Sequence, residues 1–326
     1  MNVLVTGGAG YLGSLLVPLL LAKQYRVHVV DVFLHGGRSL LGVWSHPHFE
    51  FWRADIRERS VIRAALTNID AVVHLAAIVG DPACARDPEL ARAVNLDASI
   101  QLLEESRRAK VSRFVFASTC SNYGRGEDSE KYLDETASLR PLSVYAETKV
   151  KFEQKLLESD PSADLCATSL RFATLFGVSP RMRFDLTVNE FTMELLTKKR
   201  LVVFGEQFCR PYVHVLDAAR AIELVLSAEP EKVNNQVFNV GSTSQNYQKK
   251  QLVELISSYE PLAAIEYVRR DEDPRDYRVS FARIKEQLNF EPLYTVHDGV
   301  GELVQLIRST AIRDYSDPVY YNIPMT

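Results

Sequence analysis

Cysteine is scarce in this sequence and widely scattered. The 326 residues contain four cysteines and no Cys-x-x-Cys pair; the four are Cys84, Cys120, Cys166 and Cys209. Thiols without paired spacing argue against a disulfide framework and predict free cysteines in a reducing compartment. We also expect no metal site in this chain.

Long apolar runs and basic runs are absent as well. The longest apolar helical stretch, Leu15 to Ala22, contains Pro18 and is far too short to span a bilayer. A predicted strand begins at residue 2 with no basic region before it, which is not typical of a signal peptide. With 38 basic and 42 acidic residues, the net charge is −4, and no Lys/Arg run suggests nucleic acid. We expect a cytoplasmic protein that binds neither membranes nor nucleic acid.

A glycine-rich segment at the N-terminus is the strongest signal present. An apolar strand at 2–6 leads into Gly7, Gly10 and Gly13, and an apolar helical run follows. In such a segment the first glycine permits a tight turn, the second lets the backbone approach a phosphate, and the third lets helix and strand pack closely. The helix N-terminus then offers free N–H groups to an anion. This pattern predicts a site for a dinucleotide diphosphate, with Tyr11 and Leu12 beside it.

Strands and helices alternate through the first half of the chain. The predicted strands lie at 2–6, 26–30, 71–75, 112–118 and 166–172, and the predicted helices at 10–23, 58–67, 87–109 and 143–158. The strands are rich in Val, Ile and Leu without alternation, as expected for a parallel sheet covered on both faces. Crossovers of this length predict a doubly wound α/β sheet of the Rossmann type.

The pattern becomes smaller and mixed after about residue 173. Helices are predicted at 188–199, 216–227, 249–258, 281–287 and 297–309, and strands at 201–204, 236–240 and 265–268. We therefore expect a dinucleotide-binding domain over 1–173 and a smaller mixed α/β substrate-binding domain over 174–326. The segment 201–228 is expected to return to the first domain.

Polar and small residues at the ends of the predicted strands extend the cofactor site. Asp31 follows the second strand, where a carboxylate can bridge the ribose hydroxyls and repel a 2′-phosphate, so NAD is favoured. Arg38, in the following loop, could instead accommodate a 2′-phosphate, so NADP stays an alternative. Asp55, followed by Ile56, could accept the adenine amino group or cap the next helix. His74 is expected to be a packed strand residue, and the small side chains after it, in the stretch Leu75, Ala76 and Ala77, would let the backbone approach the cofactor.

A tyrosine and a lysine four residues apart form the candidate catalytic group. Tyr145 and Lys149 would share one face of a helix, and the ammonium would lower the pKa of the phenol. The phenolate could then remove a proton from a sugar hydroxyl while hydride leaves for the nicotinamide. Ser118 and Thr119 end the preceding strand, and Thr119 could hydrogen-bond the same reacting oxygen.

These motifs together resemble the extended short-chain dehydrogenase/reductase family, and within it the NAD-dependent nucleotide-sugar epimerases and dehydratases. The motifs are, in order, Gly7-x-x-Gly10-x-x-Gly13, Asp31, Asp55, Asn95, Ser118-Thr119, Tyr123-Gly124, Tyr145-x-x-x-Lys149 and Leu170-Arg171-Phe172. The resemblance implies Thr119, Tyr145 and Lys149 as the catalytic residues and Asn95 as a support near the nicotinamide. It also implies a homodimer, for which the helices at 87–109 and 143–158 are candidates.

The resemblance extends to residues that would bind the substrate. The stretch beginning at Arg210 matches the family's Arg-x-Tyr-x-His-Val, whose arginine contacts the substrate diphosphate. Arg270 and Arg275 resemble a second phosphate clamp. Thr174 stands where the family has an Asn that meets the diphosphate, and the unusual segment after it could form a distinct sugar or phosphate pocket from Arg181, Arg183 and Asn189. The stretch from Asp81 to Cys84 could face the sugar.

The residues after Thr119 distinguish between reactions of the family. The family's 4,6-dehydratases place Asp and Glu where this chain has Cys120 and Ser121, which we expect to touch the substrate without serving as acid and base. We therefore predict a 4-epimerase acting through a transient 4-keto sugar. A net C4 dehydrogenase or 4-keto reductase is the alternative, and a 4,6-dehydratase or a non-catalytic dinucleotide sensor is less favoured.

Overall fold

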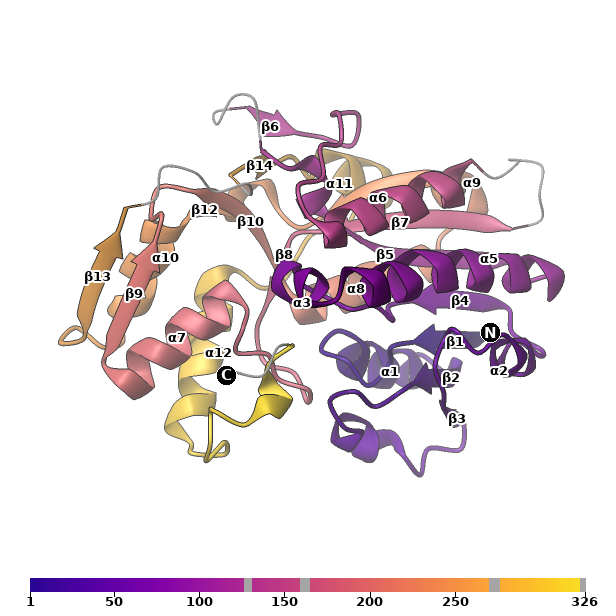
Figure 1. Cartoon of the computed structure of the whole chain (residues 1–326), viewed down its shortest axis with the longest axis horizontal. Helices are drawn as coiled ribbons and strands as arrows, with labels where there is room; N and C mark the ends of the chain where they lie inside the picture. Colours follow the sequence, from indigo (N-terminus) through magenta and orange to yellow (C-terminus); the bar gives the residue numbers. More distant parts are fainter. Residues whose placement is uncertain (126–130, 159–164, 270–275, 323–326) are drawn as a thin grey trace.

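The computed structural model describes residues 1–125, 131–158, 165–269 and 276–322. Within these ranges the chain forms a seven-stranded parallel sheet with the order β11-β7-β5-β4-β1-β2-β3 (Figure 1). The strands are β1 (Asn2–Thr6), β2 (Arg26–Asp31), β3 (Phe49–Arg53), β4 (Ala71–His74), β5 (Arg113–Thr119), β7 (Cys166–Phe172) and β11 (Gln236–Val240). Strand order reverses between β1 and β4, which is where ligands bind in such sheets. The predicted doubly wound α/β fold is confirmed.

Helices cover both faces of this sheet because its strands are apolar on both sides. Leu4 of β1 packs into one core, while Val3 and Val5 pack into the other. The helices α1 (Gly13–Ala22) and α8 (Val215–Ser227) lie together on the face of Val3 and Val5. The opposite face is covered by α2 (Arg59–Ala65), α5 (Ala98–Arg108) and α6 (Val144–Leu157).

Smaller sheets and three long helices form the other part of the molecule, on the left in Figure 1. A three-stranded sheet contains β8 (Thr174–Phe176), β10 (Cys209–His214) and β12 (Asn246–Gln248), and β9 (Arg200–Phe204) pairs with β13 (Ala264–Val268). The helix α7 (Thr187–Lys198) packs against α10 (Lys249–Ser257) and α12 (Val296–Arg308). The remaining short elements are α3 (Asp81–Arg86), α4 (Pro88–Arg92), α9 (Pro230–Val233), α11 (Ala282–Leu288), β6 (Tyr132–Leu133) and β14 (Arg278–Val279).

The strands differ from the sequence prediction in several respects. The edge strand β3 is additional in the main sheet, and β11, expected in the smaller region, pairs with β7 there. Outside the main sheet, β6, β8, β10, β12 and β14 are additional. From the segment 201–228 only α8 packs on this sheet, because β9 and β10 pair elsewhere. The helix predicted over 87–109 is interrupted by a π-helical turn at Ala93–Asp97. The domain boundary near 173 stays a prediction, since elements on both sides of it build the main sheet.

None of the helices in the described ranges is sufficiently long and apolar to span a bilayer.

Candidate active site

A cavity of about 1100 Å³ opens at the carboxyl ends of the main-sheet strands. One wall comes from the glycine-rich loop, the ends of β2, β4 and β5, and the first turns of α6. The other wall comes from β8 and β10 and from the segment between β8 and α7. Most of the predicted site residues line it, namely Gly7, Gly10, Tyr11, Leu12, Gly13, Asp31, Asp55, Ile56, Leu75, Ala76, Ala77, Ser118, Thr119, Ser121, Tyr145, Lys149, Thr174, Arg183 and Arg210. Their individual roles in binding stay predictions.

The glycine-rich loop leaves no room for side chains. Gly7 has a φ of +76°, and a Cβ there would lie 2.7 Å from the backbone nitrogen of Ala76. A Cβ on Gly13 would lie 2.5 Å from the carbonyl oxygen of Gly7. The N-terminus of α1 has no side-chain cap and no acidic residue in its first turn, so the positive end of the helix dipole is open to an anion, while the Ser14 and Leu15 nitrogens already donate to the Gly10 and Leu12 carbonyls. This cradle fits the diphosphate of a dinucleotide.

Hydrogen bonds connect the same loop to the segment between β8 and α7. The Tyr11 hydroxyl donates to the Gly177 carbonyl at 2.6 Å and accepts from Asn189 Nδ2 at 3.1 Å. Asn189 also binds the Gly177 nitrogen and the Arg183 carbonyl, and it is fully buried outside the cavity wall. The expectation that Asn189 contacts the substrate is therefore wrong for this geometry, because its amide is already occupied by backbone and Tyr11.

The two carboxylates proposed for the adenosine end differ in their surroundings. Asp31 accepts from the Ala9 nitrogen at 3.0 Å and from the Phe33 nitrogen at 2.7 Å, and burial raises its pKa. Asp55 instead receives the Arg57 side chain, with Nη2 at 2.7 Å, and this hydrogen bond lowers its pKa. An adenine amino group at Asp55 would share the carboxylate with Arg57.

Buried hydrogen bonds hold the end of β4 and the loop that follows it. His74 is buried between Thr6 Oγ1 at 2.7 Å and Ser99 Oγ at 2.8 Å, and burial lowers its pKa to about 3, as expected of a packed residue. Asn95, on the π-helical turn, donates to the Ile78 carbonyl at 2.9 Å and accepts from the Ile78 nitrogen at 2.8 Å. Asn95 lies behind the cavity wall, so it fixes the loop that lines the cavity and does not itself face a ligand.

The three candidate catalytic side chains meet where β5 ends beside the first turns of α6. Ser143 caps α6 by accepting from the Ala146 nitrogen, which places Tyr145 and Lys149 on one helical face. Lys149 Nζ donates to the Ala117 carbonyl at 2.8 Å and lies 5.8 Å from the centre of the Tyr145 ring. Thr119, in the same cavity wall, accepts from the Ser121 nitrogen at 3.1 Å.

Burial dominates the electrostatics of this pair. It raises the pKa of the Tyr145 phenol and lowers the pKa of the Lys149 ammonium to about 8. The expectation that the Lys149 ammonium lowers the Tyr145 pKa is not met in this structure, because the phenol loses solvation on burial and the ammonium is held by the Ala117 carbonyl.

The predicted substrate residues are brought together only in part. Arg183 makes a two-point contact with Asp185, at 2.9 and 2.7 Å. Cys120 is buried with its thiol donating to the Arg171 carbonyl at 3.2 Å, outside the cavity wall, so the expected substrate contact from Cys120 is wrong. The 3₁₀ turn that begins at Cys120 rotates its side chain into the core. Arg270 and Arg275 lie outside the described residues.

Arg181, a candidate pocket residue from the sequence, also lines the cavity. Several other cavity residues carry no recognisable signal in the sequence, namely Glu190, Glu194, Lys249, Tyr277 and Asn322. Burial, with the nearby Glu194 and Asp185 carboxylates, raises the pKa of Glu190 to about 7. Helical periodicity would mark Glu190 as solvated, and Asn322 follows an aromatic segment far from any motif; only the tertiary fold brings them to the site.

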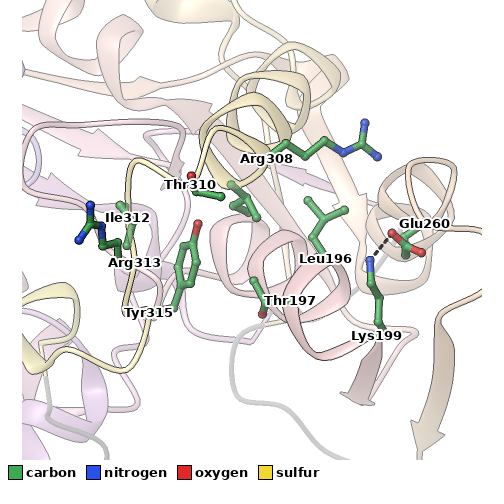
Figure 2. Close-up of a pocket in the computed structure, with 10 residues that line it drawn as sticks. Leu196, Thr197, Lys199, Glu260, Arg308, Thr310, Ile312, Arg313 and Tyr315 are labelled. Atoms are coloured by element: carbon green, nitrogen blue, oxygen red, sulfur yellow. Dashed lines mark hydrogen bonds and ion pairs between the residues drawn. The ribbon is translucent and has the colours of Figure 1, made fainter.

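A second, smaller hollow of about 470 Å³ lies at the C-terminal ends of α7 and α12 (Figure 2). Its main charges are engaged within the protein: Lys199 pairs with Glu260, and Arg308 donates to the Tyr259 carbonyl at 2.9 Å. It contains none of the predicted site residues. In the described part of the chain, no group of three or more His, Cys, Asp or Glu side chains is placed to hold a metal ion.

Known proteins share this architecture across nearly the whole chain. The UDP-glucose 4-epimerase of Thermotoga maritima, solved with UDP-glucose, is similar with a TM-score of 0.84 and 29% identity, covering 96% of this chain and 100% of that one. The dTDP-glucose 4,6-dehydratase DesIV of Streptomyces venezuelae, solved with NAD, is similar with a TM-score of 0.86 and 25% identity, covering 98% and 100%. The UDP-glucose 4-epimerase of Corynebacterium glutamicum is 28% identical over 314 residues, covering 90% and 92%.

The family model for the NAD dependent epimerase/dehydratase family matches residues 3–241, well over half of the sequence. This stretch contains the glycine cradle, the end of β5 and the pair Tyr145 and Lys149. The family resemblance expected from the motifs is thereby confirmed. The chain belongs to the NAD-dependent epimerase/dehydratase family.

Proposed function

We propose that this protein is an NAD-dependent nucleotide-sugar 4-epimerase. One observation carries the proposal: Thr119, Tyr145 and Lys149 share a single cavity with the glycine cradle and with Arg210. A dinucleotide and a sugar diphosphate can therefore lie in one enclosed space with the phenol between them. UDP-glucose 4-epimerases are among the relatives, which supports this reaction.

The fit of NAD depends on residues at the carboxyl ends of the main-sheet strands. The backbone of Gly7, Gly10 and Gly13 would hold the diphosphate, and the Asp31 carboxylate would hold the adenosine ribose. Asp31 is half-buried and already accepts two backbone hydrogen bonds, which fixes its orientation. A 2′-phosphate would meet this carboxylate, so we expect NAD rather than NADP. When bound, NAD supplies the hydride acceptor and a positive charge near Tyr145.

The protein groups would act on the sugar C4 hydroxyl. Tyr145 takes its proton as general base and returns it later, while Thr119 hydrogen-bonds the same oxygen. Lys149 keeps an ammonium beside the phenol and is itself oriented by the Ala117 carbonyl. Loss of this proton together with the C4 hydride, for which bound NAD would be the acceptor, would give a 4-keto sugar. The sugar would turn over in the cavity, after which the hydride would return to its other face and Tyr145 would reprotonate the oxygen.

A diphosphate of the substrate would lie against Arg210 and Thr174 on the opposite wall. Elimination across C5 and C6 is disfavoured because Ser121 is not an acid or base and Cys120 points into the core. A net C4 dehydrogenase or 4-keto reductase would use the same residues, and the experiment must separate it from an epimerase.

The test is to identify nucleotides that co-purify with the protein by mass spectrometry and then to incubate it with UDP-, GDP-, dTDP- and CDP-sugars. An epimerase inverts C4 without added cofactor and without a lasting absorbance change from reduced nicotinamide, and Tyr145→Phe abolishes this turnover. Stoichiometric NADH formation would identify a net oxidoreductase instead. Absence of bound or bindable NAD would refute the proposal.

We also infer a homodimer through the helices α5 and α6, as the family resemblance implies. Leu96, just before α5, and Ile100, within it, are only partly buried against the core of this face, so their remaining apolar surface is available for a second copy. Light scattering on the purified protein should give twice the chain mass of 36.8 kDa. A monomer at micromolar concentration would contradict this inference.

A further inference from the structure

Arg181 is a deeply buried cation on the cavity wall. Only 5% of its surface is exposed. Its Nη2 donates to Asn322 Oδ1 at 2.9 Å and lies 3.5 Å from the Tyr321 carbonyl. Its Nε is buried and has no hydrogen-bond partner among the described residues. A guanidinium has five N–H donors, so this one retains donor capacity that the protein does not use.

The neighbouring arginine provides a direct contrast. Arg183 is bound at two points by Asp185 and has its counter-charge in place. Arg181 has no such carboxylate: the described residues give it only the amide and carbonyl oxygens of Asn322 and Tyr321. Burial and the nearby Arg183 lower the Arg181 pKa to about 10. A buried cation that lacks a hydrogen-bonded carboxylate favours an anionic ligand.

The charged and titratable groups around Arg181 come from both sides of the cavity. Arg183 and Asp185 follow it on its own segment, and it also interacts electrostatically with Tyr11 of the glycine-rich loop and with Asp31 at the end of β2. It also acts on His35, whose pKa is lowered to about 4 by burial and then by Arg181. Arg181 therefore lies across from the glycine cradle.

We propose that Arg181 donates to the diphosphate of the dinucleotide cofactor, from the side opposite the glycine-rich loop. This assignment rests on the proposed function, which supplies the cofactor. The diphosphate is the chemical match because a guanidinium only donates and phosphate oxygens accept at two points. The ribose is already provided with an acceptor in Asp31. The substrate diphosphate is the competing source, and the sequence alone would assign Arg181 to it.

The proposal also gives the C-terminal segment a positioning role. Asn322 accepts from Arg181 and donates through Nδ2 to the Val79 carbonyl at 2.9 Å, in the loop after β4. The Asn322 nitrogen lies 3.3 Å from Asp185 Oδ2. These contacts hold the guanidinium at a fixed depth between the two walls of the cavity.

The experiment is a calorimetric titration of cofactor-free protein with NAD, ADP, adenosine and UDP. Loss of a two-point charged contact should weaken NAD and ADP by about 10- to 100-fold in Arg181→Met. Adenosine and UDP should change less than about twofold, because neither probe meets Arg181 in this arrangement. The exposed Arg313→Met, beside the second hollow, is the matched control and should leave all four affinities unchanged.

Arg181→Lys guards against a general folding defect. It keeps the charge but loses the fork, so ADP affinity should fall between those of the wild type and Arg181→Met, with an unfolding temperature near that of the wild type. Equal ADP affinity in all three proteins overturns the proposal, as does a loss confined to UDP or an equal loss for adenosine. Failure of the wild type to bind NAD refutes the proposed function itself and is distinguishable from these results.

Discussion

Lys149→Met should make the cofactor-free protein more stable while abolishing turnover. Lys149 is 3% exposed, and burial lowers the pKa of its ammonium from 10.5 to about 8. At about 1.4 kcal/mol for each pKa unit, keeping this charge in the folded protein at pH 7 costs about 3 kcal/mol. Methionine fills a similar volume against Phe116 without the charge.

The variant also removes two favourable contacts of the ammonium, a hydrogen bond and a cation–π contact 4.7 Å from the Phe116 ring centre that contributes about 0.5 kcal/mol. The Ala117 carbonyl loses its donor at 2.8 Å, which costs about 1 kcal/mol. The net expectation at pH 7 is therefore a gain of about 2 kcal/mol in the free energy of unfolding. Such a gain at a catalytic position is the expected sign of a group retained for chemistry rather than for stability.

The pH dependence gives the decisive measurement. The folded-state pKa lies below the unfolded value, so the penalty is complete below pH 8 and disappears as pH rises from 8 to 10.5. Urea unfolding of both proteins should show a difference of about 2 kcal/mol at pH 7 that falls to about zero at pH 10. Lys151→Met, an exposed lysine on the same helix, is the control and should stay within about 0.5 kcal/mol of wild type. A destabilised Lys149→Met protein with no pH dependence would refute the reasoning.

Three further predictions concern other parts of the molecule. Glu153→Ala leaves Arg171 buried without its partner at 2.6 Å, so unfolding in urea should require about 3–5 kcal/mol less free energy; an unchanged midpoint would contradict this. Gly13→Ala forces a Cβ to 2.5 Å from a backbone oxygen and should weaken NAD binding in a titration, whereas Gly42→Ala meets nothing within 4 Å and should not. Tyr145→Phe should lower kcat by about 10²–10⁴-fold with little change in UDP affinity, since only the proton-transfer group is lost; a change in KM alone would argue against its role.

The local hydrophobic pattern predicts the strands that are buried on both faces of the sheet. The strands β1 and β4 each carry a continuous apolar run, Val3 to Val5 and Ala71 to Val73, and the glycine spacing after β1 depends on steric demands within a single loop. The edge strand β3 was missed because alternate residues are exposed, and Glu50 interrupts its apolar pattern. The position of β11 could not be predicted, since its partner β7 lies 64 or more residues earlier and pairing at that range leaves no local signature.

The sequence predicts which way a candidate site residue points where regular backbone geometry determines the direction of the side chain, and it does not do so in irregular turns. Helical spacing places Tyr145 and Lys149 on one face, whereas the turn after Thr119 directs Cys120 into the core. Sequence also could not reveal how strongly burial acts on the phenol, because desolvation depends on the walls contributed by distant segments. For the same reason the sequence offers Arg181 as a pocket residue without showing that its guanidinium is buried.

The late position of β11 in the chain has a consequence for biosynthesis. Until the ribosome has added residue 240, β7 lacks its neighbour and exposes an unpaired backbone edge. A nascent chain that has emerged only to the end of β7 already carries the glycine cradle and Tyr145. Its unpaired β7 edge can still form hydrogen bonds with other chains. Fragments cut near residue 173 should therefore aggregate, and chaperones that shield strand borders should engage this protein during the interval between the two strands.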